Sequence, residues 1–207
     1  MLRPPARRAA ANSKQQEVLD VACEYFLSHG YDGASISAMA RAAGISKESI
    51  YRYFSGKKEL FEAVIDRELS DYQERLRDLD SMLKNAGLHE ALVAISETIL
   101  GVITTDRTLA LRRLIFEEAT RSPDVGQHYY QIGPETAYAK LEALFNWHLT
   151  PGEFDTPFLA RHFGAILSHR VMLERECRIR PEPTRGEIKT MAEAIVADFL
   201  KVFTRHK

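Results

Sequence analysis

The sequence has little cysteine and no long hydrophobic run. Its 207 residues include two cysteines, Cys23 and Cys177, which are too few for a disulfide framework and indicate a reducing compartment. No run of about 18 uninterrupted apolar residues is present, so we expect no membrane-spanning helix. No apolar signal core follows the basic N-terminus. We therefore expect a cytoplasmic protein without a membrane partner.

The chain also lacks an excess of charge of either sign. Its 28 Lys and Arg stand against 29 Asp and Glu, and this balance, taken alone, argues against a nucleic-acid partner. The charges are unevenly distributed, however. Residues 1–60 carry nine Lys and Arg against six Asp and Glu, whereas residues 61–207 carry nineteen against twenty-three. The near-neutral balance therefore averages a basic N-terminal part and an acidic remainder, and it does not exclude a nucleic-acid partner.

The motifs on which most enzyme active sites depend are absent. We find no nucleophile–base spacing, no metal-binding motif and no phosphate-binding loop. His162 and His169 are seven residues apart and share a helix face, whereas two metal ligands on one helix are usually four residues apart. An all-α enzyme that uses His148, His162 or His169 remains as an alternative that no spacing supports. We expect no enzyme, no cofactor and no metal site.

Helical periodicity dominates the chain from Lys14 onward, and we find no strand pattern. We expect an all-α fold of about nine helices. The expected helices are 14–30, 37–43, 47–53, 57–83, 88–103, 107–121, 123–148 with an interruption at Gly133-Pro134, 156–176 and 188–203. The expected parts of the chain are a flexible basic arm at 1–13, a small first domain at 14–60 and a larger helical domain at 61–207.

The most informative segment is residues 36–54, ISAMARAAGISKESIYRYF. If Ile36 is the first position of a helix-turn-helix motif, Ala40 falls where two helices cross closely, and Gly44 falls in a tight turn that favours positive φ. Ser35 and Ser46 are placed to cap the two short helices. The spacing of these residues predicts a helix-turn-helix, with a buried seam formed by Met39, Ile45 and Ile50.

The second helix of such a motif enters the major groove, with its N-terminal residues on base edges. Lysine can donate to guanine and glutamate can accept from cytosine there, while tyrosine and lysine near the helix end suit phosphates. Lys57 opposes the dipole of the helix that it starts, so an external anion such as a DNA phosphate is an attractive partner. The expected DNA-binding residues are Ser35, Ser37, Lys47, Glu48, Ser49, Tyr51, Arg52, Tyr53 and Lys57.

Residues 30–65, GYDGASISAMARAAGISKESIYRYFSGKKELFEAVI, resemble the N-terminal DNA-binding domain of TetR-family transcriptional regulators. This resemblance implies a homodimeric repressor that binds a palindromic operator through residues 14–60. It also implies that residues 61–207 bind a small molecule and dimerise through the last two helices. By the same resemblance, Tyr51, Tyr53 and Lys57 match phosphate contacts and Lys47, Glu48 and Ser49 match base contacts, with tyrosine at 53 where histidine is common. Residues 111–134 resemble the AefR-like subgroup.

The helix expected at 156–176 is apolar on two sides, so it must be buried on two sides. One side carries Leu159, Phe163, Ile166 and Leu173 and is expected to face the core. The other side is expected to face a second copy of the chain. A wholly intramolecular core helix would show the same pattern, and the family resemblance favours dimerisation. The expected interface residues are Phe158, His162, Ala165, His169, Met172, Ile195 and Phe199.

Aromatic residues of the larger domain are candidates for an apolar effector pocket, although aromatics at helical spacing are more often core. They are Phe116, Tyr129, Tyr130, Phe145, Trp147 and His148. Three functions stay open: a ligand-responsive DNA-binding repressor, a DNA-binding regulator controlled by a protein partner or by nothing, and the enzyme. The sequence favours the first and separates it poorly from the second.

Overall fold

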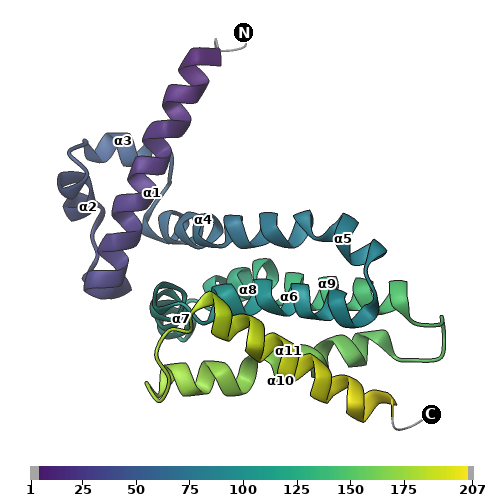
Figure 1. The fold of residues 1–207 in the computed structure, drawn as a ribbon. Coiled ribbons are helices and arrows are strands. Elements are labelled where there is room, and N and C mark those ends of the chain that lie inside the picture. Colours follow the sequence, from purple (N-terminus) through teal and green to yellow (C-terminus); the bar gives the residue numbers. More distant parts are fainter. Residues whose placement is uncertain (1–4, 205–207) are drawn as a thin grey trace. The chain divides into compact units, whose positions relative to one another are not determined.

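The computed structural model describes residues 5–204, and the side chains of residues 14–80 and 84–202 within that range. Every regular element in the described range is an α-helix, which confirms the predicted all-α class (Figure 1). In chain order they are α1 (Pro5–Gly33), α2 (Ile36–Ala42), α3 (Lys47–Tyr51), α4 (Lys57–Asp78), α5 (Asp80–Asn85), α6 (Leu88–Ile103), α7 (Asp106–Ala119), α8 (Pro123–Ile132), α9 (Pro134–His148), α10 (Thr156–Glu176) and α11 (Arg185–Thr204).

The described range holds eleven helical segments where the sequence predicts about nine helices. The interruption expected at Gly133-Pro134 separates α8 from α9. A second break, at Leu79, separates α4 from α5 and was not expected. The new helix begins at Asp80, an acidic residue that stabilises a first turn, and its carboxylate pairs with Lys140 of α9. Periodicity does not report such a distant contact.

The first helix differs from the prediction at its start and agrees with it at its end. Residues 1–4 of the expected arm lie outside the described residues. Residues 5–13 are helical, whereas a flexible arm was predicted there. Pro5 suits a first helical position, and the alanines and arginines that follow have high helix propensity. Gly30, with φ 73° and ψ 170°, interrupts the helical backbone where the sequence places the end of the helix.

The described chain divides into two compact units. The first contains the chain up to Glu68 together with Ala110–Tyr129, and the second contains Leu69–Leu109 and the chain from Tyr130. This grouping differs from the contiguous division expected after residue 60, because residues 110–129 belong with the N-terminal helices. In the first unit α2 packs against α1 and α3 (Figure 1). Phe26 and Phe61 meet edge to face there, with ring centroids 4.8 Å apart.

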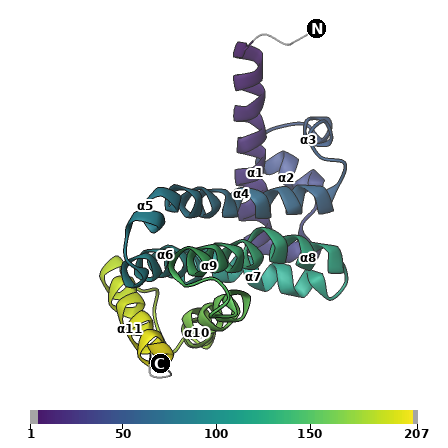
Figure 2. The ribbon, with the colours of Figure 1, turned by 90° about the vertical axis from the view of Figure 1, so that its right-hand side faces the viewer.

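In the second unit, α11 packs against α6 and α10 packs against α9 (Figure 2). The rings of Phe145, Phe163 and Phe199 meet in its core, with centroids 4.9–6.3 Å apart. Helices α9 and α10 approach closely at Gly164, where an added Cβ would lie 2.5 Å from a ring carbon of Tyr138. An alanine at this position would force the Tyr138 ring to move.

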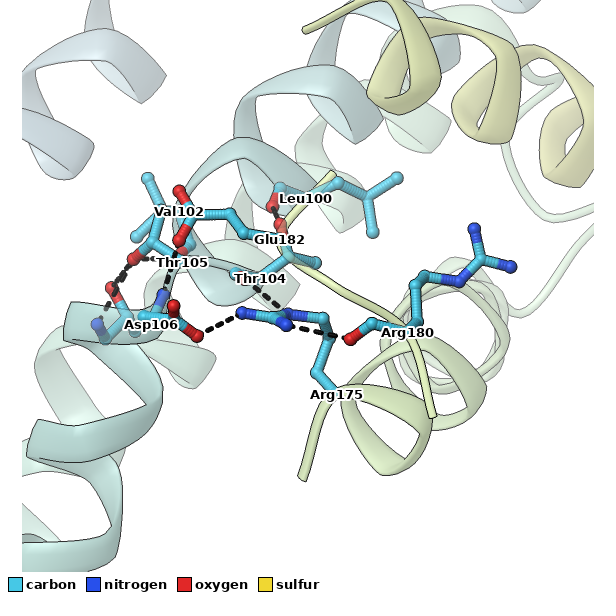
Figure 3. Close-up of polar contacts among 9 residues, drawn as sticks. Leu100, Val102, Thr104, Thr105, Asp106, Arg175, Arg180 and Glu182 are labelled. Atoms are coloured by element: carbon cyan, nitrogen blue, oxygen red, sulfur yellow. Dashed lines mark hydrogen bonds and ion pairs between the residues drawn. The ribbon is translucent and has the colours of Figure 1, made fainter. Parts of the chain in front are cut away.

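The end of α10 is held by Arg175, a buried arginine that the sequence analysis did not single out (Figure 3). Its guanidinium donates to the carbonyl oxygens of Thr104 at 2.9 Å and Arg180 at 2.8 Å and pairs with the carboxylate of Asp106. Glu182 accepts the Asp106 amide N–H at 2.8 Å at the start of α7. Because a buried charge is tolerated only when it is paired, these contacts account for the burial of Arg175.

No single helix in residues 5–204 is both long and apolar enough to cross a membrane; α6 and α7 meet the length and composition test only as a bent pair.

Candidate nucleic-acid interface

The two short helices α2 and α3 are capped as predicted. The Ser35 hydroxyl accepts the Ala38 amide N–H at 3.2 Å, and the Ser46 hydroxyl accepts the Ser49 amide N–H at 3.2 Å. Gly44 adopts φ 64° in the turn between the helices. Such caps matter because helices of seven and five residues are too short to be stable alone.

The interior of the motif also follows the predicted seam. Met39, Ala40 and Ile50 are buried, and Ile45 is half-buried. Phe54, which follows the motif, is buried as well. These apolar contacts fix the angle between α2 and α3 and leave the opposite side of α3 in solvent.

The outward side of α3 presents charged and hydroxyl groups. Lys47, Glu48 and Arg52 are exposed, and the Tyr51 side chain is 54% exposed. The Glu48 carboxylate accepts hydrogen bonds from the Glu48 amide N–H and from the Ser46 side chain, and these bonds lower the pKa of Glu48. Glu48 therefore stays ionised at neutral pH and can only accept hydrogen bonds.

Three further candidates, Ser35, Ser49 and Tyr53, are less available than the sequence suggests, whereas Ser37 is not. Ser49 is half-buried, and its hydroxyl lies 3.1 Å from that of Ser46. Tyr53 is half-buried, and the Arg52 guanidinium lies 5.0 Å from the centroid of its ring. Ser35 and Ser37 are exposed, although the Ser35 hydroxyl already caps α2.

Lys57 makes contacts that the sequence did not predict. Its ammonium donates to the carbonyl oxygens of Tyr31 at 2.9 Å and Ala34 at 3.2 Å. It also lies 4.3 Å from the centroid of the Tyr31 ring. Because these partners are 23 and 26 residues away, local spacing gave no signal for them.

Helix α10, which was expected to form the dimer interface, exposes an apolar stripe. Some residues of this stripe differ from those that the sequence predicted. Ile166 and Leu173 were expected in the core but are 53% and 54% exposed. The buried side instead follows a ridge of every fourth residue through Leu159, Phe163, Leu167 and Val171. Four residues turn a helix by about 400°, so each successive residue of this ridge lies about 40° further around the helix. The buried side therefore drifts away from the face that residues seven apart share.

The expected interface residues divide into exposed and packed ones. The exposed ones on α10 are Phe158, His162, Ala165 and His169. Met172 and Ile195 are half-buried. Phe199 packs against Phe145 and Phe163 of its own chain, so it is an intramolecular contact in this structure.

The six aromatic candidates for an effector pocket fall in both units. Phe116 and Tyr129 belong to the first unit and meet edge to face at 6.2 Å. The other four, including half-exposed Tyr130 and half-buried His148, belong to the second. Phe145 is completely buried, whereas Trp147 is 59% exposed and donates its indole N–H to the Lys84 carbonyl oxygen, so these two do not line one cavity. Among the described residues, no three His, Cys, Asp or Glu side chains gather into a metal site.

Two family profiles match the chain. The profile described as "Bacterial regulatory proteins, tetR family" matches residues 18–64. The profile described as "AefR-like transcriptional repressor, C-terminal domain" matches residues 90–205, which is more than half of the chain. The first match covers the helix-turn-helix and its flanking helices, and the second covers most of the second unit.

Several similar proteins are described as transcriptional regulators. The chain is 37% identical over 62 residues to the HTH-type transcriptional regulator TtgW of Pseudomonas putida, covering 29% of this chain and 46% of TtgW. The chain spans about half or less of the length of the curated relatives it matches first. A TetR-family regulator structure from Mesorhizobium loti is 28% identical, with TM-score 0.80 over 93% of this chain and 97% of that one. The flavonoid-responsive regulator FrrA is 29% identical, with TM-score 0.75 over 92% and 97%.

Proposed function

Because the chain belongs to the TetR family of bacterial transcriptional regulators and carries an AefR-like C-terminal domain, we propose that it is a homodimeric repressor that a small hydrophobic ligand releases from a palindromic operator. As a TetR-family DNA-binding regulator it is not an enzyme. Its proposed compartment is the cytoplasm, where a bacterial regulator meets its operator. The observation that carries the proposal is the capped helix α3 with a polar, exposed outer side.

In the proposed complex, α3 lies in the major groove. Lys47, at the first position of α3, donates to a guanine edge, and the ionised Glu48 accepts from a cytosine edge. Tyr51 is the most exposed tyrosine of the motif and donates to a phosphate, with Tyr53 and Ser37 as further phosphate partners. Arg52 and Ser49 complete the set, with Ser49 in a lesser role because its hydroxyl already contacts Ser46.

The exposed stripe of α10 supports the proposed homodimer. Phe158, Ile166 and Leu173 are each about half exposed, and Ala165 and His169 lie between them on the same helix. An exposed apolar surface of this kind typically marks a protein contact. A two-fold dimer would place two α3 helices on inverted half-sites one helical turn apart.

The proposed effector is a small apolar or aromatic molecule. FrrA, which resembles this chain over nearly its whole length, is described as flavonoid-responsive, and a similar aromatic ligand is a reasonable first class to test. A ligand that binds better to a dimer whose two α3 helices are wrongly spaced for the half-sites must weaken operator binding. The factor is the same as that by which the operator weakens ligand binding.

The experiment is a fluorescence-anisotropy titration of a labelled operator duplex, repeated with a panel of flavonoids and long-chain acyl compounds. The proposal expects nanomolar-range operator binding and at least one ligand that weakens it by about 5–150-fold, the usual range of allosteric coupling. Operator binding that no ligand in a broad panel changes would contradict ligand release and favour control by a protein partner. Absence of operator binding would contradict the DNA-binding role itself.

A further inference from the structure

The helix-turn-helix segment leaves the helical framework at one point and rejoins it at another. It leaves after Gly30, which interrupts the helical backbone of α1, and it rejoins at Lys57, the first residue of α4. Ala34, between α1 and α2, is buried, and Ser35 caps α2 directly after it. The orientation of α3 therefore depends on how firmly these two points are joined.

The Lys57 ammonium lies between the two points. It donates to the Tyr31 carbonyl oxygen at 2.9 Å and to the Ala34 carbonyl oxygen at 3.2 Å, and it lies 4.3 Å from the centroid of the Tyr31 ring. The Tyr31 ring packs against the rings of Phe26 and Phe61, with centroids 5.8 and 5.1 Å away. Since an ammonium has three N–H donors, two carbonyl oxygens and one ring face occupy most of its surroundings.

These contacts change the argument for a phosphate partner. A lysine at the first residue of a helix faces the positive end of the helix dipole, and an external anion would offset that cost. Here the carbonyl oxygens of Tyr31 and Ala34 already offset it in the free protein. A DNA phosphate would have to compete with both of them.

We propose that Lys57 is a positioning residue for operator recognition, which holds α3 at its reading angle by joining Ala34 to the start of α4 across 23 residues. The inference rests on the proposed DNA-binding function and deepens it. A phosphate contact would add affinity for every duplex and would add to the salt dependence of binding. A positioning contact adds affinity only where α3 must meet specific bases.

The first test needs no DNA. Lys57→Met keeps the apolar stem and removes the ammonium, and amide hydrogen exchange then reports on the joined segment. The Ala34 amide, which donates to the Tyr31 carbonyl oxygen, and the Ala38 amide in the first turn of α2 should exchange about tenfold faster, as expected for loss of a charged hydrogen bond. Lys58→Met is the matched control, because it removes the same charge one residue later and should leave both amides unchanged. Unchanged exchange in Lys57→Met would overturn the proposal.

The second variant guards against a general loss of structure. Lys57→Arg keeps the charge that a phosphate would need but replaces the compact ammonium with a planar fork. The proposal expects faster exchange at Ala34 in this variant too, while the amide of buried Ile65 keeps its wild-type rate. Wild-type exchange at Ala34 in both Lys57→Arg and Lys57→Met would contradict a role for the ammonium geometry.

The third test uses DNA and separates the two roles of the side chain. Lys57→Met should weaken operator binding about tenfold, leave binding to random duplex unchanged and leave the slope of log K against log salt unchanged. An equal loss on operator and random DNA, with a slope shallower by about 0.9, would make Lys57 a phosphate contact and overturn the proposal. If the wild-type protein selects no operator, the proposed function fails, while the exchange measurements still decide the positioning role.

Discussion

The Lys58 ammonium on α4 donates to the Asp124 carboxylate on α8 at 2.8 Å, between residues that are 66 positions apart. Two further pairs join the same parts of the first unit. They are Asp66 with His128, and Asp32 with Arg121. Exposed pairs contribute little one by one, but their partners Arg121, Asp124 and His128 lie along the chain on either side of the completely buried Val125. Residues 110–129 are therefore held to the N-terminal helices of the first unit.

The Lys58–Asp124 pair predicts a pH dependence of stability. The hydrogen bond from Lys58 lowers the pKa of Asp124 below its ordinary 3.8, so the pair's contribution is complete above pH 3.8 and is lost as pH falls through the folded pKa. The same bond raises the pKa of Lys58 above 10.5, so the contribution is also lost as pH rises through that higher value. We expect the difference in free energy of unfolding between the wild type and Asp124→Asn to be constant from pH 5 to 9 and to shrink in stronger acid.

Denaturant unfolding at each pH gives this difference, and Lys58→Met serves as the control because it removes the same pair from the other side. The two variants should show the same acid dependence. A difference that persisted unchanged well below pH 3 would mean that Asp124 acts through something other than its charge.

Replacement of Lys47 should relax sequence preference. Lys47→Ala removes the donor at the first position of α3, and we expect a loss of about 1–3 kcal/mol at cognate operators, concentrated at one base pair in each half-site. Competition binding against single-base variants of the operator measures this. Lys201→Ala, which removes an exposed lysine of α11, should change nothing. Equal losses for Lys47→Ala on cognate and random DNA would remove it from the base-reading set.

A charge placed on the α10 stripe should separate the proposed dimer. Ile166→Glu would bury a carboxylate at the centre of the stripe, which costs several kcal/mol unless the charge is paired. Sedimentation at micromolar concentration should then give a monomer of about 23.5 kDa. Ile179→Glu, at an isoleucine that is 75% exposed in the loop after α10, is the control and should leave the dimer intact. A dimeric Ile166→Glu protein would contradict the proposed interface.

Close packing at Gly164 predicts sensitivity to a single methyl group. Gly164→Ala would place a Cβ 2.5 Å from the Tyr138 ring, and we expect overpacking to destabilise the fold by about 1–3 kcal/mol. Gly101→Ala on α6 has no atom within 4 Å of the added Cβ and should be neutral or stabilising by up to about 1 kcal/mol. Thermal unfolding of the two variants distinguishes them. Equal Tm values would show that α9 and α10 are packed less closely than this structure places them.

The features that the sequence predicted best are those that neighbouring residues determine. Ser35, Ser46 and Gly44 act within one helical turn of their position, and the structure places each in its expected cap or turn. The start of α10 at Thr156 follows from an Asp155 cap and a proline in the first turn. Local chemistry of this kind is readable because its partners lie three or four residues away.

The features that were missed depend on distant partners. The contacts of Lys57 were not predicted because the carbonyl groups of Tyr31 and Ala34 lie 26 and 23 residues earlier. Arg175 was not singled out because Thr104 and Asp106 lie about 70 residues earlier. Ile166 was assigned to the core because a helix pattern shows which residues are apolar but not along which ridge the helix packs. Spacing in the sequence does not encode these contacts.

The most direct measurement for the central claim is selection of bound duplexes from a random pool by the purified protein. The account predicts enrichment of one sequence made of two inverted half-sites whose centres lie about 10 base pairs, or a multiple of that, apart. Wild type should bind this duplex at least about a thousandfold more tightly than random DNA at the same salt concentration. Recovery of no enriched sequence, or of a single half-site without two-fold symmetry, would contradict a dimeric operator-binding regulator.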